Sequence, residues 1–222
     1  MSRLPVFFLL LFGAFGCETF DSPPGPADTS VPLDAFSGEA GLPDASDAAP
    51  DEGGVVARRR VFVTTQLTDG TMAFGASTGG GVAGADAECQ READEASLKG
   101  NFMALLPTGA SQGARDRFDL PRRNLVLPDG TLVAVGFNEL FGTGPNVPID
   151  MGADGTRVAG NATVYTGMRK LGGTRLENCA FWSKATASGS YGLLSDTTAW
   201  VEVLAQMDLD CNIPRRVYCF ER

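Results

Sequence analysis

The chain has 222 residues, five cysteines, no histidine and a formal net charge of −9 at pH 7. Without histidine, Ser-His-Asp and Cys-His nucleophile systems and the usual catalytic zinc sites are excluded. The acidic balance leaves no broad basic surface, so we expect no nucleic-acid partner. We therefore expect a protein that is not an enzyme and that has no cofactor.

An apolar leader opens the chain. Arg3 is the only charge before Leu4–Gly16, a run of 13 residues that is well short of the ~20 a membrane-spanning helix needs. It predicts a signal peptide over residues 1–16. The letters AFG before Cys17 resemble the box that precedes the acylated cysteine of bacterial lipoproteins, although leucine is usual where Ala14 stands. We expect lipid on Cys17 to anchor the protein in the cell envelope, in the outer membrane of a Gram-negative bacterium. The alternative is a secreted protein.

Residues 17–57 have the composition of a disordered linker. From Glu18 to Ala57, Pro, Gly, Ala, Ser and Asp dominate, and nine acidic residues occur without a lysine or arginine. Such a segment buries too little apolar surface to offset the entropy lost on ordering. Residues 58–222 carry 18 acidic and 17 basic side chains, so the acidity belongs to the linker. Their length suits one domain.

Residues 58–222 predict an α+β domain with one main helix. The alternating run RVFVTT, residues 60–65, predicts a strand. The segment 84–100 predicts a helix whose apolar face carries Ala85, Cys89, Ala93 and Ala96, with Glu88, Arg91, Glu92 and Glu95 elsewhere on the helix. Further short strands are predicted at 101–106, in a hairpin over 124–135, and at 162–167, 179–182, 191–194, 199–203 and 216–221.

The order of VFVTT, the cysteine-bearing helix, ENCAFW, a tryptophan, a cysteine and a terminal VYCFE resembles endostatin-like domains. The resemblance covers about residues 60–222 and extends to bacterial domains of unknown function in exported and lipid-anchored proteins. It implies a C-type-lectin-like fold with long loops and two disulfides, Cys89–Cys219 and Cys179–Cys211. The residues alone allow three pairings of four cysteines. A zinc site is the rival use of these cysteines, but the chain has no CxxC pair.

A loop near the C-terminus contains the candidate metal ligands. Asp208, Asp210 and Asn212 alternate in MDLDCNIP, a spacing that lets oxygens converge on calcium. Asp150 and Asp154 are candidates for the further ligands that calcium requires. The glycine and the bidentate acid that an EF-hand loop needs at later positions are missing. We therefore expect a polar loop that binds no calcium.

Other motifs have simpler explanations. GGGVAG, residues 79–84, matches a dinucleotide-binding pattern, but 13 residues separate it from the preceding strand, so we expect a flexible loop. Trp182 and Trp200 are expected in the core. The sequence thus predicts a membrane-tethered recognition or adhesion module that binds a glycan or a protein through loops between residues 137 and 207. The alternatives are an envelope hydrolase acting through paired carboxylates and a structural envelope protein.

Overall fold

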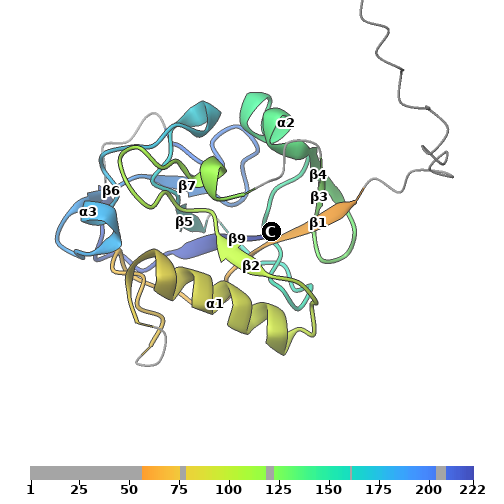
Figure 1. Cartoon of the computed structure of the whole chain (residues 1–222), viewed down its shortest axis with the longest axis horizontal. Coiled ribbons are helices and arrows are strands. Elements are labelled where there is room, and N and C mark those ends of the chain that lie inside the picture. Colours follow the sequence, from red (N-terminus) through yellow and green to blue (C-terminus); the bar gives the residue numbers. More distant parts are fainter. Residues whose placement is uncertain (1–56, 76–78, 119–122, 161, 204–208) are drawn as a thin grey trace, which may run out of the picture. The chain divides into compact units, whose positions relative to one another are not determined.

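The computed structural model describes residues 57–75, 79–118, 123–160, 162–203 and 209–222. They form a mixed α+β fold of short elements (Figure 1). The predicted leader, Cys17 and nearly all of the acidic linker lie outside the described residues. The helices are α1 (Gly81–Glu95), α2 (Gly136–Gly142) and the single turn α3 (Cys179–Trp182). The strands are β1 (Arg58–Val63), β2 (Phe102–Ala104), β3 (Asn124–Val126), β4 (Leu132–Val135), β5 (Thr163–Tyr165), β6 (Ser188–Gly189), β7 (Tyr191–Leu193), β8 (Leu209–Asp210) and β9 (Arg216–Glu221).

Strand β9 lies at the centre of a curled seven-stranded sheet. The strand order is β4-β3-β1-β9-β5-β7, and β2 also pairs with β9. Strand β1 runs antiparallel to β9, with Phe62 opposite Cys219. Strand β5 pairs in parallel with the start of β9, and β2 pairs antiparallel with its end. The last strand of the chain therefore joins segments from the whole domain, while β6 and β8 form a separate two-stranded sheet.

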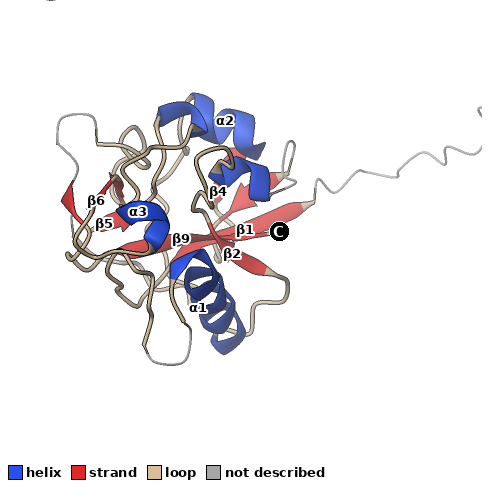
Figure 2. Ribbon diagram, turned by 60° about the vertical axis from the view of Figure 1, so that its left-hand side comes forward, coloured by secondary structure: helices blue, strands red, loops and turns tan. Residues whose placement is uncertain are grey.

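The central strands are buried on both faces. In β1, Val61 and Val63 belong to a core that includes α2, whereas Phe62 between them belongs to a second core that includes α1. In β9, Phe220 and Cys219 divide between the two cores in the same way. This alternation follows from the period of two in a strand. Figure 2 shows α1 and α2 on opposite sides of the sheet.

Helix α1 buries the apolar face that its sequence predicts. Ala85, Cys89 and Ala93 are fully buried. The helix begins three residues earlier than predicted and ends at Glu95. Asp86 ties it to β2, because its Oδ1 accepts a hydrogen bond from the Ala104 backbone N–H at 2.9 Å. Small apolar side chains let the helix lie close to the sheet, where Cys89 reaches β9.

Two of the predicted strands are wrong. Residues 179–182 form α3, in which φ is positive at all four positions. Residues 199–203 form no strand; they bond to β7 through Leu193 N–H to Ala199 O and Val203 N–H to Tyr191 O rather than through a continuous ladder. Apolar runs of four or five residues predict burial in both cases, and burial is what Trp182 and Trp200 have. Helix α2, which the sequence does not predict, carries part of the core that includes Val61 and Val63.

Two disulfides fasten the domain. Cys89 pairs with Cys219, and Cys179 pairs with Cys211, which is the pairing that the resemblance implies. All four cysteines are fully buried. Disulfides of this kind indicate an oxidising compartment outside the cytosol. Among the described residues, no helix has both the length and the apolar character that crossing a membrane requires.

The second disulfide lies in a region with little regular structure, which we call the loop region: residues 68–72, 166–190 and 209–215. The bridge from Thr68 to Arg215 joins the first segment to the third, and the short β6–β8 pair joins the second to the third. A further bridge, Asn178 to Gly189, lies within the second segment. Figures 1 and 2 place β6 and α3 on the side of the domain away from the start of β1.

Within the loop region, α3 is a left-handed turn. Four consecutive residues, none of them glycine, have φ between 52° and 62°. A left-handed helical conformation costs an L-residue about 1–2 kcal/mol because Cβ approaches the following carbonyl oxygen. The surrounding contacts must therefore hold this turn in place.

Candidate functional site

A small open pocket lies where α1 meets the segment after β1. Its volume is about 140 Å³, and its lining consists of Thr65, Glu92, Glu95, Ala96, Ala153 and Asp154. Three of these six residues carry carboxylates. The volume is below that of pockets for drug-sized ligands, so the pocket suits a single polar group or part of one sugar ring.

Glu92 is the central acid of this pocket. It is only 5% exposed, and its carboxylate accepts hydrogen bonds from the Thr65 N–H and hydroxyl at 2.9 Å and from the Gln66 N–H at 3.0 Å. Burial raises the pKa of Glu92, although these hydrogen bonds act in the opposite direction. The side chain thereby holds α1 against the chain that leaves β1.

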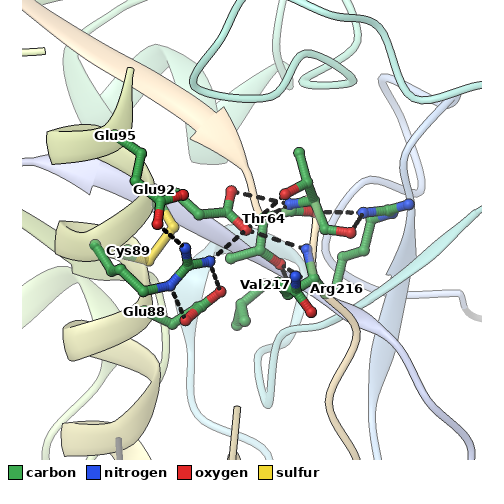
Figure 3. A network of polar contacts seen from close by, with 11 residues as sticks. Thr64, Glu88, Cys89, Glu92, Glu95, Arg216 and Val217 are labelled. Carbon is green, nitrogen blue, oxygen red and sulfur yellow. Dashed lines mark hydrogen bonds and ion pairs between the residues drawn. A yellow bond between two sulfur atoms is a disulfide. The ribbon is translucent and has the colours of Figure 1, made fainter. Parts of the chain in front are cut away.

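One arginine serves the three glutamates on this side of α1. Arg91 pairs with Glu88 at 2.5 Å and with Glu95, and its guanidinium lies 3.8 Å from Glu92. The hydrogen bonds with Glu88 and Glu95 raise the pKa of Arg91. Figure 3 shows these glutamates side by side on α1, facing the end of β1 at Thr64. Arg91 thus links the three carboxylates into one cluster of ion pairs.

Arg216 is the second cation near the pocket. Its Nη1 donates to the backbone oxygens of Thr64, at 2.6 Å, and of Thr65. Burial lowers the pKa of Arg216, and the nearby charge of Glu92 partly offsets that effect. The arginine fixes the same short segment, residues 64–66, that Glu92 holds from the other side. Two side chains from distant parts of the chain thus set the shape of this wall.

Asp154 also lines the pocket. Its Oδ1 accepts from the Thr156 N–H at 2.9 Å and from the Thr156 hydroxyl. These hydrogen bonds lower the pKa of Asp154. The pocket therefore combines a buried carboxyl whose pKa is raised with an exposed one whose pKa is lowered. Its acceptors suit the hydroxyl groups of a sugar or the N–H groups of a peptide.

The structure describes only part of the candidate metal-binding loop, 208–212. Asp208 lies outside the described residues, and Asp210 and Asn212 are exposed. No group of three or more acidic or cysteine residues there has the geometry to hold a metal ion. Asp150 pairs with Arg157, and Asp154 has the bonds given above. The expectation of a loop without calcium stays a prediction.

The other sequence motifs are part of the folded scaffold. Trp182 and Trp200 are buried, 1% and 3% exposed. The expectation of a flexible loop at GGGVAG is wrong for most of this motif, because residues 81–84 form the first turn of α1. The loops between 137 and 207 include the left-handed turn α3, whose Phe181 is 42% exposed. The pocket itself draws Asp154 from these loops and its other carboxylates from α1.

The sequence does not identify Glu88 and Glu92 as buried. Both lie off the apolar face of the predicted helix, yet they are 1% and 5% exposed. The available signal is their spacing from Arg91, since acids three residues before and four after a basic residue, here Glu88 and Glu95, meet it on a helix. That spacing predicts a cluster of ion pairs on the helix. It does not predict which part of the domain buries Glu88 and Glu92.

No protein-family model matches this chain, and no curated protein sequence matches it.

Proposed function

We propose that this chain is an exported lipoprotein, anchored by lipid on Cys17, whose C-terminal domain is a C-type-lectin-like module that binds a glycan or a protein. The observation that carries the proposal is the pair of buried disulfides, which belongs to an oxidising compartment. The short leader that ends at Cys17 and the acidic linker behind it support export and tethering. The residues that bind the ligand would include the pocket beside α1.

The tether is tested by metabolic labelling with an alkyne fatty acid in a Gram-negative host. We expect the wild-type chain to carry the label and to fractionate with outer membranes. The Cys17→Ser variant should carry none and should be recovered in the soluble fraction, because two or more acyl chains are what hold such a protein on a membrane. Wild-type protein without label would contradict the proposal.

Recognition is tested on arrays of glycans and of extracellular proteins, with the exported chain carrying Cys17→Ser as the probe. We expect binding to a discrete set of spots that is lost after reduction and alkylation. The matched variant is Glu95→Gln, because the Glu95 side chain is 65% exposed and lines the pocket. Weaker binding by this variant would place the ligand in the pocket. An array without spots would contradict the recognition proposal.

A hydrolase remains the second candidate, because the pocket contains Glu92 and Asp154 with pKa values shifted in opposite directions. Such a split is typical of acid and base pairs in glycosidases. The bonds of Glu92 to Thr65 and Gln66 favour a structural role instead. Incubation with purified cell-wall sacculi and chitin oligosaccharides, followed by chromatography, decides between them. Fragment release that Glu92→Gln abolishes would make the protein a hydrolase.

A further inference from the structure

The left-handed turn α3 is held at both of its ends. Cys179, its first residue, is bonded to Cys211. Trp182, its last residue, donates its indole N–H to Pro107 O at 2.9 Å and is buried. Before the turn, Asn178 Oδ1 accepts from the Phe181 N–H at 2.9 Å. Ala180 and Phe181, between the two ends, are exposed. The turn therefore depends on its end contacts.

The Cys179–Cys211 disulfide lies between two glycines. A Cβ on Gly189 would come within 2.7 Å of Cys179 Sγ and 2.8 Å of Cys211 Sγ, and a Cβ on Gly70 would come closer still to Cys179 Sγ. The Gly70 N–H donates to Cys211 O, and the Cys211 N–H donates to Ala187 O. Three segments of the loop region thus close on this bond, and a reductant reaches it only when they open locally.

The Cys89–Cys219 disulfide has different surroundings. Cys89 lies in the middle of the right-handed helix α1, and Cys219 lies in β9 between β1 and β2. Both residues have ordinary backbone conformations, held by helix and sheet hydrogen bonds. Breaking this bond leaves no left-handed segment free to relax.

We propose that the Cys179–Cys211 disulfide is a redox-controlled constraint on α3, whose reduction lets the turn leave its left-handed conformation and rearranges the loop region while the sheet stays folded. A dithiol reductant supplies two electrons and two protons. The S–S bond breaks, Cys179 and Cys211 become thiols, and the dithiol closes to its own disulfide. The exposed Phe181 then changes position, so the surface of the loop region differs between the two redox states.

The test uses the full exported chain with Cys17→Ser, which leaves only the four paired cysteines. The protein is titrated with dithiothreitol without denaturant, trapped with N-ethylmaleimide and mapped by mass spectrometry. We expect Cys179 and Cys211 to be labelled at least ten-fold faster than Cys89 and Cys219, because the loop region opens without global unfolding. Equal or faster labelling of Cys89 and Cys219 would overturn the proposal.

Hydrogen exchange of the partly reduced protein tests the conformational step. We expect the amides of Phe181, Trp182 and Ser183, which are bonded within the turn, to lose protection at least ten-fold, whereas β9 keeps its protection. Unchanged protection in the turn would also overturn the proposal. Both measurements use the Cys17→Ser chain with its four paired cysteines intact, so they do not depend on whether a variant of those four cysteines folds.

A glycine substitution tests the role of the left-handed conformation. Ala180 has φ of 52°, and glycine adopts that conformation without steric cost. Ala180→Gly should therefore favour the closed turn and slow the reduction of Cys179–Cys211 about five-fold. The control is Ala110→Gly, at an exposed loop residue outside the positive-φ set, which should leave the rate unchanged. Equal rates in both variants would show that the backbone conformation plays no part.

Discussion

The sheet around β9 and the loop region are both closed by a buried disulfide, but they are held together differently. In the sheet, the strands are joined by ladders of backbone hydrogen bonds, and side chains of the central strands alternate between two cores. In the loop region, single side-chain contacts add to the short β6–β8 pair: the Tyr165 hydroxyl, which has one proton to donate, lies 2.9 Å from Cys211 O and 2.8 Å from Ile213 O. This domain therefore has one part specified by a repeating pattern of side chains and another part specified by single contacts.

The largest expected effect is on the sheet. Replacing both Cys89 and Cys219 by alanine removes a bond between residues 130 positions apart, which the chain-entropy estimate values at about 5 kcal/mol. Urea unfolding should show that loss in the free energy of unfolding with one cooperative transition, because the sheet keeps its ladder. A loss below about 1 kcal/mol would mean that the unfolded chain is already compact.

Gly189→Ala should have the next largest effect, because the new Cβ would come within 2.8 Å of both sulfur atoms of the loop disulfide. Overpacking of this kind costs about 3 kcal/mol, measurable by urea unfolding. The matched control is Gly173→Ala: Gly173 has φ of −69°, and its new Cβ would meet only the Arg169 Cβ at 4.0 Å. The control should be neutral or slightly stabilising. Equal losses in both variants would refute the packing argument.

A third effect on stability is expected at Arg215. This residue is 2% exposed, and its Cζ lies 5.0 Å from the ring centres of both Tyr165 and Tyr191. Its Nη1 donates to the carbonyl oxygens of Asp210 and Ile213 at 3.3 Å. Arg215→Lys keeps the charge but not the planar group that stacks between two rings, so we expect a loss of about 2 kcal/mol. Arg215→Met removes the charge but keeps a long side chain, so its stability relative to Arg215→Lys separates the contribution of packing from that of charge. Full stability in the lysine variant would mean that stacking contributes nothing.

The sequence predicts the sheet well because its strands follow the period of two. RVYCFE coincides with β9, and the hairpin over 124–135 contains β3 and β4. The sequence fails at 179–182, since the left-handed turn depends on Cys211 and Pro107, which are distant in the chain. Alternating and apolar runs of residues indicate that side chains are buried, but they do not indicate the sign of φ.

Only part of the pocket can be predicted from the sequence. Asp154 belongs to a recurring local pattern in which an aspartate accepts from the N–H of a threonine two residues later, as at Asp69, Asp129 and Asp196. Three of the four read Asp-Gly-Thr in the sequence, so these turns are predictable from turn chemistry. That Asp154 and Glu92 line one pocket is not predictable, because it depends on how a long loop packs against α1.

The pH dependence of stability should distinguish Glu92 from Asp154, which both line the pocket. Because the pKa of Glu92 is raised in the folded state from an ordinary value of 4.5, its contribution to stability is present below pH 4.5 and is lost as the pH rises through the folded pKa. Each ten-fold difference in proton affinity between the folded and unfolded states corresponds to about 1.4 kcal/mol. Relative to wild type, Glu92→Gln should therefore gain stability in urea unfolding between pH 4 and pH 7.

Asp154→Asn is the matched variant and should show the opposite sign with the smallest effect. The pKa of Asp154 is lowered in the folded state from an ordinary value of 3.8 by its bonds to Thr156. Its contribution is therefore present above pH 3.8 and is lost as the pH falls through the folded pKa. The variant should lose stability at neutral pH and approach wild type near pH 3. Solvent screens this exposed group, so the change is small. Slopes of the same sign in both variants would contradict the assignment of one buried and one exposed carboxylate to this pocket.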